Sequence, residues 1–197
     1  MIGRNGNLQA FIDLAQRAIE SCWQGPSYSA AHRVFERITR HVGDANSGEG
    51  DRLPVCGHLD TVYANMSAGG RPMPEFARSF AAIEGQLRWT RRTAASPDNQ
   101  PFYDGHANAM LIGPGGLEQR EDVMVGISLM APHIRYVDHS HPPEEVYLAF
   151  TDGEWWNAAM PWTEPGPGGL IYNPPGIMHA MRSGEKPFLA LWLLPVG

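Results

Sequence analysis

The sequence predicts a mainly β protein, a sandwich or barrel of short strands preceded by a helical N-terminal region. Three observations lead to this prediction. The chain has 197 residues, which is the usual length of one domain. Its 22 glycines and 17 prolines make up about a fifth of all residues, so turns are frequent. Near Gly85 the apolar pattern changes from three- and four-residue steps to short runs separated by turn residues.

Residues 1–85 form the expected helical region. Gly25-Pro26 ends the first apolar stripe, Gly43 is the expected C-cap of the second helix, and the Gly- and Ser-rich stretch 45–52 is a loop that we expect to be mobile enough to act as a lid. Amphipathic helices need a surface to cover, so this region should pack on the β part and not form an independent domain. The stripes predict helices over residues 8–23, 31–42 and 76–83.

Residues 86–197 form the expected β domain. Residues 87–90 alternate between apolar and polar, as a half-buried strand does. Further short apolar runs follow, separated by Gly- and Pro-rich turns, and this pattern is typical of a sandwich or barrel. The runs cover residues 109–112, 123–130, 146–150, 169–172 and 188–194.

Charge and composition exclude several classes of protein. The formal net charge is −6, with 15 basic and 21 acidic residues, which argues against a surface for nucleic acid or anionic membranes. No stretch approaches the ~20 apolar residues of a membrane span. Two cysteines, Cys22 and Cys56, exclude a disulfide framework, and residues 1–8 lack the apolar segment of a signal peptide. We therefore expect a cytoplasmic protein that binds neither nucleic acid nor membranes. Either a monomer or a homodimer is expected.

The segment His-Ser-His-Pro-Pro-Glu-Glu-Val-Tyr carries the chemistry. In an extended chain, side chains two residues apart point to the same side, so His139, His141, Glu145 and Tyr147 should share one face. Two imidazoles and a carboxylate on one face are suited to a divalent metal ion, and Fe, Mn, Ni, Zn or Co are all compatible with them. A tight turn followed by a short strand makes His179 the expected fourth ligand.

These residues resemble the two motifs of the cupin superfamily. The first, H-x-H-x(3,4)-E-x(6)-G, fits from His139 onward, although Gly153 comes one residue later than the motif has it. The second, P-x-G-x2-H-x3-N, fits from Pro174 to His179, with Ser183 in place of asparagine. The resemblance covers residues 105–197 and implies a single cupin, or jelly-roll, β-barrel.

Two tyrosines make the resemblance narrower. Tyr147 follows Glu145 by two residues and Tyr136 precedes His139 by three, which is similar to the cupin-type dimethylsulfoniopropionate (DMSP) lyases, DddQ-like enzymes in particular. The resemblance implies a carbon–sulfur lyase that cleaves DMSP by β-elimination into acrylate and dimethyl sulfide. It also implies that Tyr147 is the base, while Tyr136 orients the substrate or assists proton transfer.

Two other functions remain open from the residues alone. An Fe(II) cupin dioxygenase would use the same ligands and consume O₂, without needing a tyrosine base. A non-enzymatic cupin would use its metal only to stabilise a small-molecule binding site. Glu144 points to the opposite face from Glu145 and is expected to be solvated, and the remaining histidines are interpreted as surface or structural residues.

An aromatic pocket is expected for the sulfonium group of DMSP, because aromatic faces attract weakly hydrated cations. Several aromatic side chains lie near the motifs in the sequence, although ordinary core packing is an equally good interpretation of each one. These candidates are Trp155, Trp156, Trp162, Tyr172 and Trp192.

Overall fold

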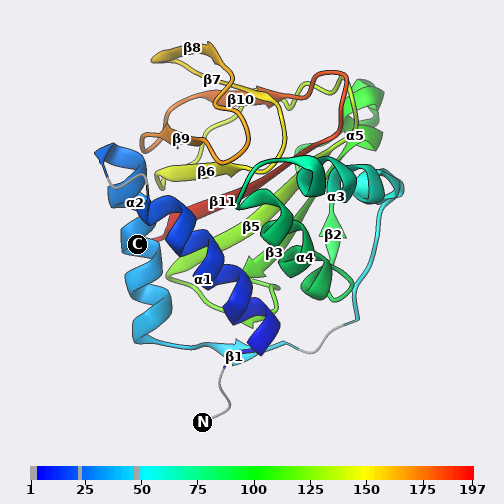
Figure 1. Ribbon diagram of the computed structural model, residues 1–197. Coiled ribbons are helices and arrows are strands. Elements are labelled where there is room, and N and C mark those ends of the chain that lie inside the picture. Colours follow the sequence, from blue (N-terminus) through cyan, green and yellow to red (C-terminus); the bar gives the residue numbers. More distant parts are fainter. Residues whose placement is uncertain (1–3, 22–23, 47–48) are drawn as a thin grey trace.

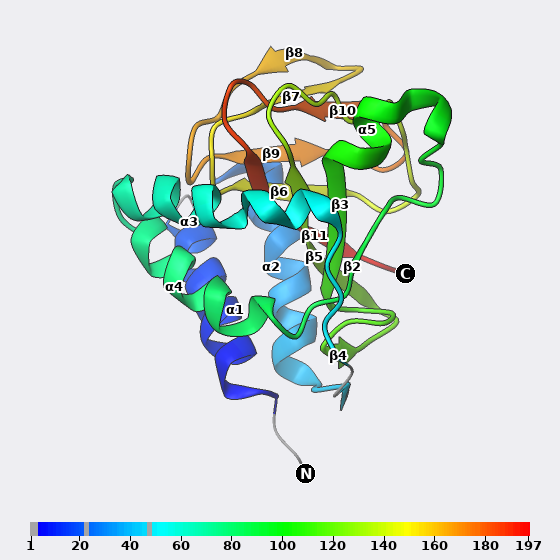
Figure 2. The same ribbon diagram turned by 90° about the vertical axis from the view of Figure 1, so that its right-hand side faces the viewer.

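Helices cover one face of a large sheet, and a second, smaller sheet lies at the top of the molecule in both views (Figures 1 and 2). The computed structural model describes residues 4–21, 24–46 and 49–197. No helix in these ranges is long and apolar enough to cross a membrane.

The three expected helices are present. The side chain of Asn5 caps the first by accepting hydrogen bonds from the backbone N–H groups of Asn7 and Leu8. Pro26 stands at the start of the second, so Gly25-Pro26 not only ends one apolar stripe but also begins the next helix. The last two residues of the predicted first helix, 22–23, lie outside the described residues. The helices are α1 (Gly6–Glu20), α2 (Gly25–Arg40) and α4 (Met73–Glu84).

The prediction that Gly43 caps a helix is wrong, because α2 ends at Arg40 and His41 is its C-cap. Gly43 instead lies against the backbone of Gln119, where a Cβ atom would come within 2.0 Å of the carbonyl oxygen. Several helices were not predicted. One of them carries an apolar stripe, Leu59, Val62 and Met66, that was not recognised, and the other three are too short to form a stripe. The helices that were not predicted are η1 (Pro54–His58), α3 (Leu59–Ala68), η2 (Pro97–Asn99) and α5 (Gln100–Gly105).

The large sheet has eight strands within the described ranges. Its central strands match the predicted apolar runs closely, and β5 matches exactly the range 123–130. The order is β1-β4-β3-β5-β11-β6-β9, with β2 paired to β3. The strands are β1 (Asp44–Ala45), β2 (Trp89–Thr90), β3 (His106–Ile112), β4 (Glu118–Gln119), β5 (Val123–Met130), β6 (Glu145–Ala149), β9 (Leu170–Asn173) and β11 (Phe188–Pro195).

The small sheet has the order β10-β7-β8, from β7 (Glu154–Asn157), β8 (Met160–Thr163) and β10 (His179–Arg182). Among the described strands, the pairings form two sheets and no closed ring. The expectation of a mainly β chain therefore needs correction to a mixed α and β fold, because helices also occur after residue 85 and strand β1 occurs before it. A single closed barrel stays a prediction.

One apolar core joins the helices to the large sheet. It contains Phe11 of α1, Phe35 of α2 and Phe80 of α4 together with Val125 of β5 and Leu191 of β11, all of them buried. The expected lid, residues 45–52, falls partly outside the described residues, which omit 47–48. Its described ends pair with Glu118 and Arg88, at the edge of the large sheet that lies far from β6. This placement gives the lid no support.

Candidate metal centre

Three histidines converge between the two sheets. The ligand nitrogens of His139, His141 and His179 lie within 4.8 Å of one another. His139 and His179 face each other across two backbone hydrogen bonds of 3.0 and 2.9 Å, which hold the segment before β6 against the start of β10. Both side chains are more than nine-tenths buried, whereas His141 is partly exposed. Backbone pairing thus brings His139 and His179 together, although they are far apart in the sequence.

A backbone carbonyl fixes each of the three imidazole rings. The Nδ1 atoms of His139, His141 and His179 lie 2.9 Å from the carbonyl oxygens of Val137, Pro143 and Ile177, respectively. Nδ1 therefore carries the proton, and Nε2 presents its lone pair to the centre. The buried Nε2 atom of His179 has no hydrogen-bond partner in the described structure. A set of inward-facing imidazole lone pairs fits a divalent cation.

Glu145 lies beside two of these rings. Its Oε2 atom is 3.4 Å from Nε2 of His141 and 3.2 Å from Nε2 of His179, and it accepts a hydrogen bond of 3.2 Å from the Asn173 amide. Burial raises the pKa of Glu145, but the two imidazoles outweigh it and hold the pKa well below its usual value. Burial, followed by the nearby His179, lowers the pKa of His139 to about 4. Burial also lowers the pKa of His141, but the hydrogen bond to Glu145 and the charge of that carboxylate outweigh burial and raise it. Metals bind ionised carboxylate and neutral imidazole, so a cation bound here would replace the proton of His141.

The backbone conformation of residues 139–147 differs from the extended chain that the sequence predicts. Residues 139–147 are not one extended strand, because the chain bends at Pro142 and Pro143 and β6 begins only at Glu145. Proline cannot donate a ladder hydrogen bond, so the strand is interrupted there. The backbone N–H of Gly176 donates to the carbonyl of His141 at 3.0 Å, which anchors the bend to the turn before His179. Gly176 has a φ of 70°, which favours glycine.

Both predicted tyrosines are almost completely buried beside the histidines. Tyr147 follows Glu145 on the same face of β6, and burial followed by the Glu145 charge raises its pKa well above the usual value. The ring of Tyr136 lies 5.1 Å from that of His139, centroid to centroid. Its hydroxyl accepts a hydrogen bond of 2.9 Å from the Asn108 amide, so its own proton is free for another acceptor.

A pocket of about 360 Å³ opens beside these groups. His139, His141, Tyr136 and Tyr147 contribute polar groups to its lining, and Met124, Trp192, Leu194 and Val196 contribute apolar groups. Trp192 is the one expected aromatic candidate that lines this pocket in the described structure.

The other aromatic candidates lie elsewhere. Trp155 is buried against Tyr147 and Phe188, whereas Trp156 and Trp162 pack on each other outside the pocket. The hydroxyl of Tyr172 donates to Glu144 at 2.8 Å. Glu144 also pairs with Arg33 of α2, so the expectation that Glu144 is solvated is wrong.

The sequence did not predict three polar residues that support the site, namely Ser128, Asn108 and Asn173. Ser128 donates to Asn108 at 2.7 Å, which orients the Asn108 amide toward Tyr136, and Asn173 holds Glu145. A polar residue inside the apolar run 123–130 was the signal available for Ser128. Ser183, at the position of the motif asparagine, donates to the carbonyl of Ala131 at 2.6 Å and accepts from the backbone N–H of Ile134 at 2.9 Å. Its role here is to hold the segment 131–134.

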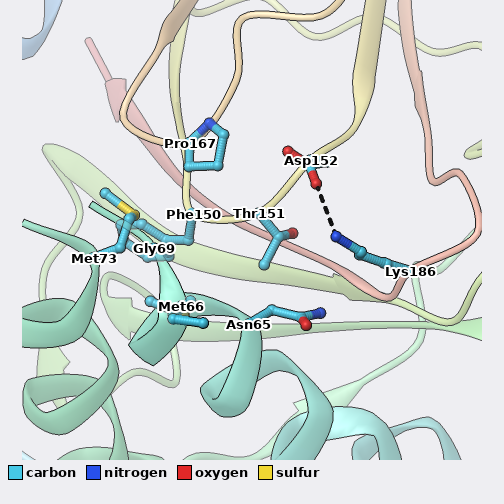
Figure 3. A pocket seen from close by; sticks show the side chains of 10 residues that line it. Asn65, Met66, Gly69, Met73, Phe150, Thr151, Asp152, Pro167 and Lys186 are labelled. Atoms are coloured by element: carbon cyan, nitrogen blue, oxygen red, sulfur yellow. Dashed lines mark ion pairs between the residues drawn. The ribbon is translucent and has the colours of Figure 1, made fainter. Parts of the chain in front are cut away.

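A second cavity, of about 280 Å³, lies between α3, the start of α4 and the turns that follow β6 and precede β11 (Figure 3). Phe150 and Thr151 line it, and Lys186 pairs with Asp152 at 3.7 Å on one side. Its lining contains one carboxylate and no histidine, so it offers no comparable metal ligand set. The histidine pocket is therefore the candidate site for chemistry.

Comparison with known proteins identifies a family with the same sequence pattern. The sequence pattern of the dimethylsulfoniopropionate lyase family matches residues 27–190. The chain belongs to this DMSP lyase family. All four proposed metal ligands and both tyrosines lie inside the matched range.

Relatives of this DMSP lyase family member include the dimethylsulfoniopropionate lyase DddQ of Ruegeria pomeroyi, which is 30% identical over 116 residues. That match covers 58% of this chain and 58% of DddQ, less than two thirds of the relative's length. The solved structure of DddQ from the same organism has a TM-score of 0.70 at 22% identity and covers 95% of this chain and 91% of that one. A structure described with the DMSP lyases RdDddP and RnDddQII has the same TM-score at 18% identity, with 96% and 92% covered. The fold of this DMSP lyase family member thus combines N-terminal helices with cupin-like sheets.

Proposed function

We propose that this chain is a metal-dependent DMSP lyase. In the proposed reaction a proton leaves the carbon next to the carboxylate, a carbon–carbon double bond forms, and the carbon–sulfur bond breaks. The electron pair of that bond leaves with sulfur, so dimethyl sulfide departs and acrylate and one proton remain. The observation that carries the proposal is a pocket lined by His139, His141, Glu145 and Tyr147. His179 lies directly against this group, within 4.8 Å of the other two histidine nitrogens and 3.2 Å from Glu145.

Tyr147 is the proposed base. Its hydroxyl is buried, and it follows the ligand Glu145 on the same strand face. A divalent cation held by His139, His141, His179 and Glu145 would stabilise negative charge on the substrate as a Lewis acid and favour the ionised form of Tyr147. Without that cation, burial and the Glu145 carboxylate keep Tyr147 protonated, because both raise its pKa. The proposal therefore ties activity to metal content.

The pocket lining contains groups that suit both ends of DMSP. Trp192 offers an aromatic face to the dimethylsulfonium group, which is a weakly hydrated cation. Tyr136 keeps its hydroxyl proton free, because the hydroxyl accepts from Asn108, and can donate it to the substrate. This lining agrees with a substrate that is anionic at one end and cationic at the other.

The test is detection of dimethyl sulfide above a solution of DMSP and the protein. We expect release from metal-loaded protein, little release after chelation, and recovery when Zn, Fe, Mn, Ni or Co is added back singly. Release that is equal with and without O₂ excludes the dioxygenase alternative. Absence of release under every metal, with bound metal verified by elemental analysis, would contradict the proposal and favour a binding-only cupin.

A further inference from the structure

Two neighbouring arginines follow β2, and they serve different parts of the structure. They lie on the segment that leads from β2 to α5 along the right-hand side of Figure 2. Arg91 is held by α5. Its Nε atom donates to the Tyr103 carbonyl at 2.7 Å, its guanidinium lies 4.1 Å above the Tyr103 ring, and it pairs with Asp104 at 3.7 Å. These contacts account for its charge within the fold.

Arg92 points to the candidate site. It lines the same pocket as the histidines, and its guanidinium carbon lies 6.0 Å from the centre of the Tyr136 ring. In the described part of the chain Arg92 forms no ion pair, since the carboxylate of this pocket, Glu145, lies against His141 and His179 instead. The pocket wall thus carries an arginine whose charge has no carboxylate partner in the fold.

His106 holds the backbone of Arg92 in place. The backbone N–H of Arg92 donates a hydrogen bond to Nε2 of His106 at 3.0 Å, and Nδ1 of His106 donates one to the Phe102 carbonyl. The His106 ring is completely buried and stacks on Phe102 with centroids 3.7 Å apart. The hydrogen bond from Arg92 fixes the backbone at this residue, while the Arg91 side chain contacts α5 and the Arg92 side chain lines the pocket. The buried histidine is a positioning residue in this arrangement.

We propose that Arg92 binds the carboxylate of the substrate, so that the pocket selects short carboxylic acids, a proposal that rests on the proposed function. A guanidinium donates two parallel hydrogen bonds to a carboxylate. The apolar residues of the lining, which are Met124, Trp192, Leu194 and Val196, offer no charged group that competes for that anion. A carboxylate has enough lone pairs to accept from Arg92 while also facing the histidine centre. Arg92 thereby sets which end of DMSP enters beside Tyr136 and leaves the sulfonium end to Trp192.

The decisive experiment compares Arg92→Gln with Arg91→Gln in metal-loaded protein. Arg92→Gln should raise the KM for DMSP by ~10- to 100-fold, the usual loss for a hydrogen bond to a charged group, with a smaller change in kcat. Arg91→Gln is the control for loss of a positive charge at the neighbouring residue. Its KM should stay within about twofold of the wild-type value, because the contacts of Arg91 lie on α5. Arg92→Lys keeps the charge without the paired donors and should fall between wild type and Arg92→Gln. An unchanged KM in Arg92→Gln, or an equal rise in both glutamine variants, would overturn the inference.

A binding measurement separates this inference from the proposed function. Propionate and its neutral isostere propanamide are titrated calorimetrically into metal-loaded wild type and Arg92→Gln. Loss of propionate affinity in the variant, with propanamide affinity unchanged, supports the role of Arg92 even if wild type releases no dimethyl sulfide. Equal propionate affinity in both proteins overturns that role even if wild type is an active lyase. Circular dichroism of each variant verifies that the fold is intact.

Discussion

The indole of Trp192 occupies the space into which a side chain at Gly126 would project. The two residues are paired across β11 and β5, and a Cβ atom on Gly126 would lie 2.1 Å from Cζ2 of Trp192. The φ of Gly126 is not in the left-handed region, so the requirement for glycine comes from this close approach alone. Glycine at this position allows the indole to lie over β5 and line the pocket.

Gly126→Ala should therefore displace Trp192 from the pocket wall. We expect a loss of about 1–3 kcal/mol in the free energy of unfolding, as for other overpacked sites, and a higher KM for DMSP. Gly57→Ala is the matched control, because a Cβ there meets no atom within 4 Å. Chemical denaturation and steady-state kinetics measure the two effects. Unchanged values in Gly126→Ala would show that the indole can move without consequence.

Tyr147→Phe removes only the proposed base. Turnover should fall by ~10²–10⁴, the usual contribution of a positioned acid–base group, while metal content stays equal to that of wild type. Tyr28→Phe, on the α2 helix, is a control for loss of a tyrosine hydroxyl far from the pocket. Comparable turnover of Tyr147→Phe and wild type at equal metal content would remove this tyrosine from the mechanism and direct attention to Tyr136.

Asn173→Ala tests the support behind the metal ligands. The carboxylate of Glu145 keeps its charge but loses the amide that orients it, so metal affinity should fall by ~10- to 100-fold. Competition with a chromogenic chelator measures this affinity. Asn7→Ala, an exposed position on α1, should not change it. An unaltered affinity in Asn173→Ala would mean that Glu145 is held by the histidine centre alone.

His106 makes stability depend on pH. Burial lowers its pKa in the folded chain below the ordinary ~6.5, so at pH values between the two the unfolded chain binds more protons. The free energy of unfolding should therefore fall as the pH drops below ~6.5, by at most ~1.4 kcal/mol per pH unit for this group. His139, whose pKa is lowered to about 4, contributes in the same direction, whereas His141, whose pKa is raised, contributes in the opposite direction. Urea denaturation between pH 7.5 and 5 measures the free energy of unfolding at each pH. This free energy should depend less steeply on pH in His106→Gln than in wild type, and an equal dependence would refute the assignment.

We propose that residues 1–85 are a layer of the fold and not a separate domain. Phe35 of α2 and Leu191 of β11 belong to one buried core, so a fragment of residues 86–197 would expose the helix-facing side of the large sheet. This fragment should lack the cooperative unfolding transition of the full chain and be digested quickly by protease. A transition at the temperature of the full chain would show that the β region folds independently.

The histidine centre could be predicted because its information is local. His139, His141 and Glu145 stand in one short segment, and the turn at Pro174–Gly176 marks His179 from its own neighbours. Long apolar runs such as β5 and the stripe of α1 were predictable for the same reason, since periodicity depends only on nearby residues. Elements such as β7, with four residues, and η2, with three, are too short to show a period.

Other features of the site depend on which strands become neighbours. Trp192 lines the pocket because β11 lies between β5 and β6, and Asn108 reaches Tyr136 because Ser128 of β5 holds its amide. Arg92 differs from Arg91 only through the contact of its backbone with His106. Residue types and their spacing were enough to predict the ligand types, the two tyrosines and the long helices α1 and α2. That Arg92, Trp192 and Asn108 reach the pocket follows only from the tertiary structure. Their positions depend on the order of the strands and on hydrogen bonds between residues that are distant in the chain.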